Sequence, residues 1–300
     1  MAQRADAELV RRGLARSRKH ASALVAAGRV RVDGAAVRKP SSPVSPGQDV
    51  TVEADPDEPG YASRAGEKLA GALDGLAGDP YGRVVSDRVP GAVCLDLGAS
   101  TGGFTDVLLR RGAAHVTAVD VGHDQMVPAL RADPRVTVRE GCNVRHLTLD
   151  DLDAAPDVVV GDLSFISLRL VLPALSGVMS DGSQALLLVK PQFEVGRDRL
   201  GSGGVVRDLA LHVESVVGVG RAAMAAGLSV HAVVPSALPG PSGNREYFCW
   251  VSSSGAASTD LAAHATEALE IAARTAVAWR PDAMLPPVAL VPTDIYGGAA

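Results

Sequence analysis

Two charged residues occupy positions at which a parallel sheet would bind a ligand. Asp162 ends the apolar run 156–162, and Lys190 ends the run 183–190. Continuous apolar runs predict central strands covered on both faces, and ligands bind at the carboxyl ends of such strands. A lysine that is desolvated or close to another cation can lose its proton and then accept one from a hydroxyl group. The two residues therefore indicate a site for proton transfer.

A glycine-rich turn provides a second candidate site. Residues 93–105 read as a short buried strand, a turn with Gly98, Gly102 and Gly103, and the start of a helix. A ligand can lie against bare backbone there, because no Cβ holds it off. A second predicted strand ends at Asp120, at the separation of about twenty residues from which a carboxylate binds the two hydroxyls of a ribose. An ordinary structural turn is the alternative.

Other chemistries lack their motifs. The glycine spacing fits neither the G-x-G-x-x-G turn of dinucleotide-binding proteins nor the G-x-x-x-x-G-K-[ST] phosphate loop. The carboxylates lack metal-ligand spacing, and the three cysteines, Cys94, Cys142 and Cys249, show no zinc spacing. We therefore predict no metal site and reduced cysteines that serve packing.

Strands and helices alternate through most of the chain. This alternation predicts an α/β domain over residues 63–254, followed by an Ala- and Ser-rich helix and tail over 255–300. Seven strands are predicted, at residues 93–97, 114–120, 136–138, 156–162, 183–190, 228–235 and 244–251. Helices are predicted at residues 63–76, 105–111, 122–133, 209–226 and 259–277.

Composition limits the choice of partners. The 300 residues suit two modest domains, and 47% hydrophobic residues are ample for a core. A net charge of −5 gives no overall attraction to nucleic acid, so any such attraction must be local. The N-terminus has no long apolar segment, which predicts a cytoplasmic protein without membrane insertion.

Basic charge gathers at the N-terminus. From Arg4 to Lys39 there are ten Lys and Arg residues against three acidic ones. Two helices, at 5–12 and 17–27, and strands around an Asp-Gly turn predict a small α+β domain over 1–54, joined by a linker at 55–62. Such a basic face can bind RNA phosphates, while a solvated helix face is the alternative.

Several motifs together resemble one protein family. LDLGASTGGFT resembles motif I of class I S-adenosylmethionine-dependent methyltransferases in its FtsJ-like form, and LVRRGLARSRKHASALVAAGRVRVDG resembles the S4-type RNA-binding domain. Lys68, Asp162, Lys190 and Glu246 follow the K-D-K-E order of 2′-O-ribose methyltransferases. With GGVVRD at 203–208, the chain is similar over residues 4–252 to the TlyA family of rRNA 2′-O-methyltransferases, also called hemolysin A.

The resemblance implies a Rossmann-like class I methyltransferase sheet and methylation of cytidine ribose in ribosomal RNA. Lys190 would accept the proton of the 2′-hydroxyl and Asp162 would orient it, while Lys68 and Glu246 would tune its charge and place the ribose. The implied S-adenosylmethionine-binding residues are Asp96, Gly98, Ser100, Thr101, Gly102, Gly103, Phe104, Asp120, Cys142, Asn143 and Asp162. The implied RNA-binding residues are Arg4, Arg11, Arg12, Arg16, Arg18 and Lys19.

Three alternatives remain open. Methylation of a base commonly shows an N-P-P-[YF] motif after the fourth strand, where this chain has GDLS. A non-catalytic RNA-binding or ribosome-assembly factor would share the basic domain. A pore-forming toxin would need membrane-length apolar segments or aromatic belts. The linker also lacks the basic–aromatic pair found in some relatives, so its role in coupling the domains stays open. We expect a monomer that acts on ribosomal RNA or ribosomal subunits.

Overall fold

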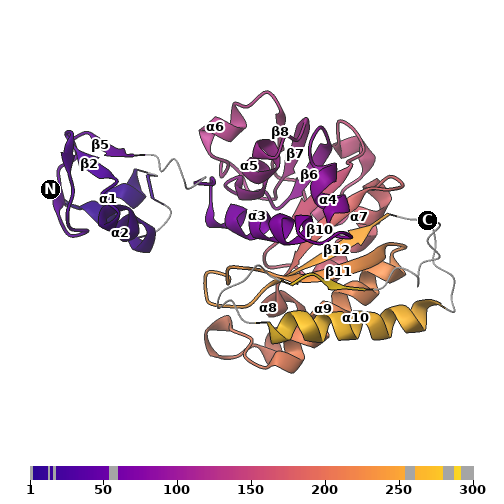
Figure 1. Cartoon of the computed structure of the whole chain (residues 1–300). Coiled ribbons are helices and arrows are strands. Elements are labelled where there is room, and N and C mark those ends of the chain that lie inside the picture. The colour runs from indigo at the N-terminus through magenta and orange to yellow at the C-terminus, as the bar shows by residue number, and fades with distance from the viewer. Residues whose placement is uncertain are drawn as a thin grey trace. The chain divides into compact units, whose positions relative to one another are not determined.

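Two compact units make up the chain, Met1–Arg64 and Ala65–Ala300, and each is treated by itself (Figure 1). The computed structural model describes residues 3–12, 14–15, 18–53, 60–253, 261–279 and 287–291, without the side chains of residues 19, 20, 202 and 261–264. Most of the predicted linker and the ends of the predicted tail therefore lie outside the described residues.

The smaller unit packs two helices against short strands. Helices α1 (Ala5–Arg11) and α2 (Arg18–Ala26) fall within the helices predicted at 5–12 and 17–27. Gly28 follows α2 with a φ of 71°, the left-handed conformation in which glycine commonly ends a helix. The strands are β1 (Gln3–Arg4), β2 (Val30–Val32), β3 (Ala35–Ala36), β4 (Pro43–Val44) and β5 (Val50–Val52).

The Asp-Gly turn joins β2 to β3 as predicted. Asp33 and Gly34 both have positive φ, 48° and 79°, as a tight hairpin turn of this kind requires. Strand β2 pairs antiparallel with both β3 and β5, and β1 pairs with β4. Leu9, Leu24 and Val30 lie in the core between helices and strands.

An eight-stranded sheet forms the centre of the larger unit (Figure 1). Its order is β13-β11-β12-β10-β9-β6-β7-β8. The strands are β6 (Val93–Leu97), β7 (His115–Val119), β8 (Val136–Arg139), β9 (Val158–Gly161), β10 (Gln184–Val189), β11 (Ser229–Pro235), β12 (Tyr247–Ser252) and β13 (Ala289–Leu290). Strands β6 to β10 are parallel to one another, whereas β12 runs antiparallel to both β10 and β11.

The chain reverses its direction of travel across the sheet between β6 and β9. From β6 it proceeds outward through β7 to β8, then returns to β9 on the other side of β6. Open α/β sheets bind ligands outside the carboxyl ends of strands at such a switch point. The turn after β6 and Asp162 after β9 therefore face one crevice.

Helices cover both faces of this sheet. The helices are α3 (Arg64–Ala77), α4 (Arg83–Arg88), α5 (Gly103–Arg110), α6 (Pro128–Arg131), α7 (Leu172–Val178), α8 (Pro191–Glu194), α9 (Leu209–Ala225) and α10 (Leu261–Ala278). Alternate residues of β12 show the two faces: Cys249 belongs to the core formed with α7, α9 and α10, whereas Phe248 stacks on Phe104 of α5 with ring centroids 6.0 Å apart. Helix α3 lies beside α5, because Arg111 donates to the Ala70 carbonyl at 3.2 Å.

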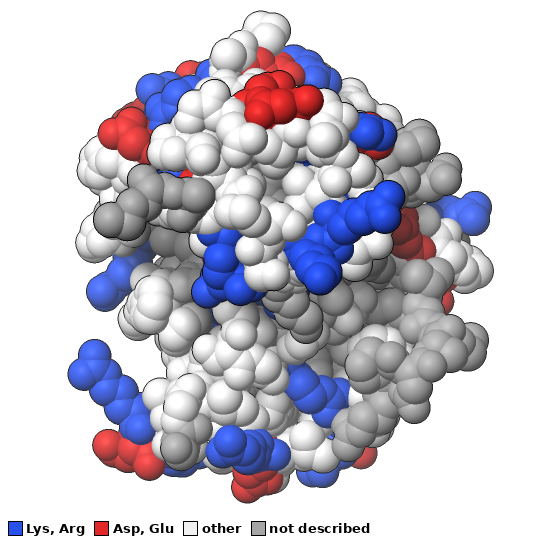
Figure 2. Space-filling view, turned by 90° about the vertical axis from the view of Figure 1, so that its left-hand side faces the viewer, with Lys and Arg blue, Asp and Glu red and all other residues white. Residues whose placement is uncertain are grey.

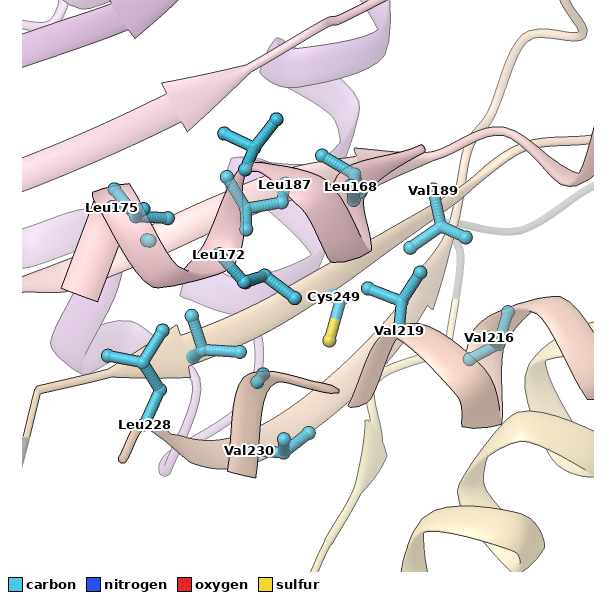
Figure 3. Close-up of a cluster of buried hydrophobic side chains, with 14 of the residues drawn as sticks. Leu168, Leu172, Leu175, Leu187, Val189, Val216, Val219, Leu228, Val230 and Cys249 are labelled. Atoms are coloured by element: carbon cyan, nitrogen blue, oxygen red, sulfur yellow. The ribbon is translucent and has the colours of Figure 1, made fainter. Parts of the chain in front are cut away.

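Aliphatic side chains fill the first of these two layers. Figure 3 shows Leu172 and Leu175 of α7, Val216 and Val219 of α9 and Cys249 converging from opposite sides of one cluster. Only 3% of the residues are aromatic, and closely packed leucine and valine side chains fill this part of the core in their place.

The fold class is confirmed, but the predicted count of seven strands is wrong. The eighth strand, β13, comes from the proline-rich tail and pairs with β11 through Leu290 and Ala289. Two residues are too few for alternation to be visible in the sequence. Helices α4, α7 and α8 lie in stretches for which no helix is predicted. The helix predicted at 122–133 is wrong in extent, because only α6, Pro128–Arg131, is helical there.

Candidate active site

The turn between β6 and α5 requires glycine. Gly98 has a φ of 81°, and a Cβ there would lie 3.0 Å from Cδ2 of Leu163 and 3.1 Å from the carbonyl oxygen of Asp162. Gly102 has a φ of 93°, and its Cβ would overlap Leu130. Other residues would therefore be strained at both positions. Both glycines are thus required by the packing of the turn against neighbouring protein groups, and Gly98 also lines the adjacent cavity.

The Asp120 carboxylate is oriented by backbone donors. The N–H of Ser100 donates to Oδ2 at 2.8 Å, and the N–H of Gly122 donates to Oδ1 at 2.7 Å. Each carboxylate oxygen can accept a further hydrogen bond. The group is thus held ready for two neighbouring hydroxyls.

A cavity of about 770 Å³ opens beside the turn and is called here the donor cavity. Six of the predicted cofactor-binding residues line it, namely Gly98, Ser100, Asp120, Cys142, Asn143 and Asp162. Val121, Gln125, Leu163 and Ile166 also line it, and sequence reasoning missed them. Val121 is apolar but 70% exposed, and this exposure, which indicates a ligand-contacting residue, is visible only in the structure.

The remaining predicted cofactor residues build the turn instead of lining the cavity. Thr101, Gly102, Gly103 and Phe104 form the end of the turn and the start of α5, and among the described residues that line the donor cavity none of them appears. Asp96 is fully buried within β6. Its Oδ2 accepts a hydrogen bond from the Thr105 hydroxyl at 2.7 Å, and burial raises the pKa of Asp96 to about 7.

Two ion pairs join the four residues of the predicted tetrad. Nζ of Lys68 lies 2.5 Å from Oε2 of Glu246, and both side chains are almost completely buried. Gly240 leaves space for this carboxylate, because a Cβ there would lie 2.5 Å from Oε1 of Glu246. A lysine beside an apolar helix stripe is usually solvated, so the burial of Lys68 could not be read from its position in α3.

Strand register brings the second ion pair next to the first. Val189 and Tyr247 are partners in the antiparallel pairing of β10 with β12. Lys190 follows Val189 and Glu246 precedes Tyr247, so both lie at the same end of the sheet. Nζ of Lys190 lies 2.7 Å from Oδ1 of Asp162. The structure therefore brings all four residues to one end of the sheet.

A second cavity, of about 730 Å³, lies on the other side of Lys190 and is called here the acceptor cavity. Lys190, Gln192, Asn244 and Glu246 line it. The loop after β9, residues 162–170, separates it from the donor cavity, and residues 164–167 line both. Phe165, at the tip of this loop, is 92% exposed with a φ of 63°, and its ring lies 5.2 Å from that of Phe193.

Glu194 anchors this loop, and the sequence analysis assigned it no role. Its buried carboxylate accepts hydrogen bonds from the Ser167 hydroxyl at 2.6 Å, the Leu168 N–H at 2.8 Å and Nε of Arg169 at 3.1 Å. Glu194 ends α8, the helix that begins directly after Lys190. The loop and the lysine are therefore fixed to the same short helix.

The basic residues of the smaller unit are held by two buried carboxylates. Asp6 forms ion pairs with Arg4 and Arg18, and Glu8 forms ion pairs with Arg11 and Arg12. These arginines hold the pKa values of both carboxyls at about 2, chiefly through side-chain hydrogen bonds. The side chains of Arg4, Arg11 and Arg18 are half exposed or more.

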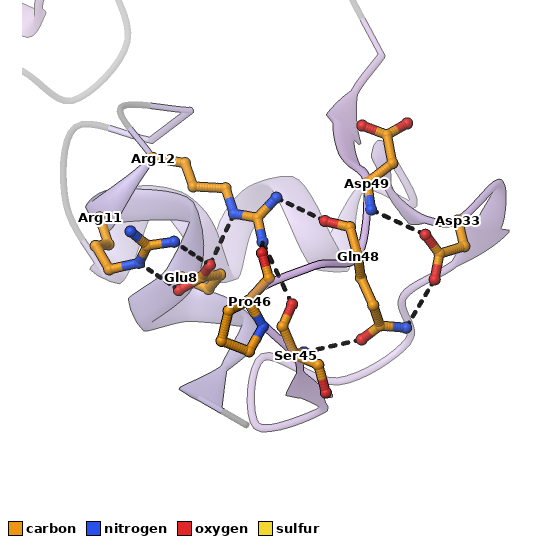
Figure 4. A network of polar contacts seen from close by, with 8 residues as sticks. All are labelled: Glu8, Arg11, Arg12, Asp33, Ser45, Pro46, Gln48 and Asp49. Carbon is orange, nitrogen blue, oxygen red and sulfur yellow. Dashed lines mark hydrogen bonds and ion pairs between the residues drawn. The ribbon is translucent and has the colours of Figure 1, made fainter. Parts of the chain in front are cut away.

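Arg12 differs from the other three arginines. Its side chain is only 21% exposed, and it donates to the carbonyl of Gln48 at 2.7 Å as well as to Glu8 (Figure 4). It therefore ties α1 to the loop before β5. Of the remaining predicted RNA-binding residues, Arg16 and the side chain of Lys19 lie outside the described residues. Figure 2 shows that blue Lys and Arg atoms are more prominent than red acidic ones on one face of the molecule.

Comparison with known proteins gives the class. Residues 61–253 match the FtsJ-like methyltransferase family, and residues 3–50 match the S4 domain. The chain therefore belongs to the FtsJ-like methyltransferases and carries an S4 domain before the methyltransferase sheet.

Individual relatives narrow this class. The chain is 52% identical over 253 residues to the 16S/23S rRNA (cytidine-2′-O)-methyltransferase TlyA of Mycobacterium tuberculosis, covering 84% of this chain and 91% of the relative. It is 38% identical to YqxC of Bacillus subtilis, covering 82% and 84%. A solved structure named as a hemolysin of Streptococcus thermophilus is 34% identical and matches with a TM-score of 0.66, covering 91% and 94%. The chain is a member of the TlyA family.

The name hemolysin occurs among the relatives, and a pore-forming protein needs segments that span a membrane. Among the residues that the structure describes, no helix combines the length and apolar character needed to cross a bilayer.

Proposed function

We propose that this chain transfers a methyl group from S-adenosylmethionine to the ribose 2′-hydroxyl of a cytidine in ribosomal RNA. The observation that carries the proposal is the position of Lys190, which lines the acceptor cavity while its ion-pair partner Asp162 lines the donor cavity. A proton acceptor at the junction of a cofactor site and a substrate site suits methyl transfer to a hydroxyl. The named activity of the Mycobacterium tuberculosis relative supports the substrate.

The donor cavity has the features that S-adenosylmethionine requires. Asp120 is oriented to accept from the two ribose hydroxyls, and Gly98 of the tight turn lines the cavity beside it. Val121 offers an exposed apolar surface for the adenine, with Cys142 and Asn143 at the same cavity wall. When bound, S-adenosylmethionine supplies a methyl group on a positively charged sulfur.

Residues of this chain would handle the proton. After Lys190 has released its ion-pair proton to solvent, its neutral amine accepts the proton of the 2′-hydroxyl as the oxygen forms its bond to carbon, and Asp162 stabilises the resulting ammonium. The buried Lys68–Glu246 pair fixes the neighbouring strand edge. No acid is needed for the leaving group, because the sulfur departs neutral. The reaction therefore depends on alignment and proton removal.

The RNA would contact both units. Arg4, Arg11 and Arg18 of the S4 domain are exposed enough to reach phosphates while buried carboxylates orient them. At the acceptor cavity, the exposed ring of Phe165 offers a face for an unstacked nucleobase.

The test is transfer of tritium from methyl-labelled S-adenosylmethionine to purified ribosomal subunits, with wild type and Lys190→Ala compared. Label in RNA that leaves one ribose linkage resistant to alkali, and that is lost with Lys190→Ala, is the expected result. Cofactor binding, measured by calorimetry, should be retained by the variant.

The same assay separates the alternatives. Label in alkali-sensitive RNA would indicate base methylation and refute the 2′-O assignment. Cofactor binding without transfer to either subunit would refute ribosomal RNA as the substrate. Retention of full activity by Lys190→Ala would refute the assigned proton acceptor.

A further inference from the structure

Two groups of the loop after β9 contact the amine of Lys190. Oδ1 of Asp162 lies 2.7 Å from Nζ, and the Ser164 hydroxyl accepts a hydrogen bond from Nζ at 2.8 Å. The contact with Asp162 is an ion pair without hydrogen-bond alignment, because that oxygen has no hydrogen-bond partner among the described residues. Among the residues that the structure describes, Ser164 is thus the group whose hydrogen bond fixes the direction of an N–H bond of Lys190.

The direction of the amine matters for the proposed reaction. A neutral amine has one lone pair, and that lone pair receives the proton only when it faces the hydroxyl. Charge attraction to a carboxylate limits the distance of Nζ but sets the direction of its N–H bonds less strictly than an aligned hydrogen bond does. A hydrogen bond to a fixed oxygen limits rotation about the Cε–Nζ bond. Ser164 therefore supplies what the ion pair with Asp162 does not.

Ser164 lies at the position where such control is needed. It lines both the donor cavity and the acceptor cavity, whereas Lys190 and Asp162 each line one. The ring of Phe193 lies on another side of the amine, with Nζ 5.9 Å from the ring centroid. The two polar neighbours of Nζ, Asp162 and Ser164, are thus on the loop after β9, and the aromatic neighbour of Nζ, Phe193, is on α8.

The hydroxyl is itself held in place. Glu194 fixes the loop three to five residues beyond Ser164 through Ser167, Leu168 and Arg169. Helix α8 begins directly after Lys190 and ends at Glu194. The amine of Lys190 and the loop that carries the Ser164 hydroxyl are therefore connected through the same short helix. Their separation is therefore maintained through the fold and not only through their own contact.

From these contacts we infer that Ser164 is a positioning residue for Lys190, which aims the lone pair of the amine at the 2′-hydroxyl in the acceptor cavity. The inference rests on the proposed function of Lys190 as proton acceptor. It assigns a fifth residue to the site, outside the Lys68–Asp162–Lys190–Glu246 set, and gives its loop a role in the reaction.

Steady-state methyl transfer to ribosomal subunits tests the inference with four variants of the full chain. Ser164→Ala removes the acceptor, Ser164→Thr keeps a hydroxyl, and Lys190→Ala removes the amine. Ser176→Ala is the matched control, because it removes a part-buried serine hydroxyl of α7 that donates to the Ala226 carbonyl and is not among the described residues that line either cavity. Thermal unfolding checks that each variant is folded.

Ser164→Ala should lower kcat between about 10-fold and 100-fold, the cost of a misaligned reacting group, with KM for subunits and cofactor little changed. Ser164→Thr should recover most of this loss, and Ser176→Ala should leave kcat close to that of the wild type. A purely structural role of Ser164 would not give a loss confined to kcat together with rescue by threonine.

Four results would overturn the inference while leaving the proposed function intact, provided that Lys190→Ala is inactive. They are wild-type kcat in Ser164→Ala, a raised KM with unchanged kcat, equal loss in folded Ser164→Thr, and equal loss in Ser176→Ala. A wild-type protein that places no methyl group on a 2′-oxygen, or an active Lys190→Ala variant, would instead refute the proposed function itself.

Discussion

Replacement of Asp96 by asparagine should change how the stability of the larger unit depends on pH. Asp96 is fully buried in β6, and this burial is the main cause that raises its pKa from 3.8 to about 7, against the opposing hydrogen bond from Thr105. Below pH 3.8 the side chain is protonated in both the folded and the unfolded state. Between these two pKa values only the folded state holds the proton, so stability falls as pH rises and levels off above about pH 7.

The expected size follows from the two pKa values. A difference of one pKa unit corresponds to about 1.4 kcal/mol, so the wild type should lose about 3 kcal/mol between pH 5 and pH 8 through this one group. The asparagine side chain of the variant has no charge to bury, and its amide oxygen can still accept from Thr105. The difference in unfolding free energy between Asp96→Asn and wild type should therefore shift in favour of the variant by this amount across the same interval.

Tryptophan fluorescence during urea unfolding is a suitable assay. Both tryptophans, Trp250 and Trp279, belong to the larger unit, so the signal reports that unit alone. Asp133→Asn is the control, because hydrogen bonds from Arg135 hold the pKa of Asp133 at about 2, outside the interval. Parallel pH profiles for wild type and Asp96→Asn would refute the reasoning.

Two further predictions concern ion pairs. Glu246→Gln should destabilise the larger unit by about 3–5 kcal/mol, because it leaves the buried charge of Lys68 without its partner. Urea unfolding followed by tryptophan fluorescence would measure this loss of stability. A loss below about 1 kcal/mol would contradict the prediction. Arg12→Ala should speed amide hydrogen exchange in residues 3–50 by about tenfold, which corresponds to the loss of one hydrogen bond. Arg11→Ala should change the exchange rate little, because Arg11 bonds to Glu8, whereas Arg12 bonds to Glu8 and also to a backbone carbonyl. Equal exchange rates in the two variants would contradict this prediction.

Local pattern was sufficient to predict the main elements of the sheet. The runs ending near Asp162 and Lys190 are continuous and apolar, and both form central parallel strands, β9 and β10. Leu69, Leu73 and Leu76 of α3 repeat at helical spacing, and all three are buried. The glycine turn at Gly98 also has the conformation that its sequence predicts.

Contacts between distant segments could not be predicted in this way. Lys68 and Glu246 are separated by 178 positions in the chain, and nothing in either neighbourhood specifies the other. The family resemblance named both residues but not their direct contact. Ser164 is the last residue of GDLS, and Glu194 follows Lys190 by four positions, yet the contacts of both are visible only in the fold of the loop after β9. Asp96 shows the opposite case, a residue in a typical binding motif that the strand turns inward.

The place of β12 in the sheet governs when the site can form. This strand is among the last in the chain, yet it lies between β10 and β11 rather than at an edge. A growing polypeptide that has reached β11 must therefore leave a vacancy inside its sheet, with Lys68 lacking its counter-charge, until Glu246 and the residues after it are synthesised. A chain that stops before Glu246 would lack both β12, which joins β10 to β11, and the counter-charge of Lys68, so the site depends on one of the last strands to be synthesised.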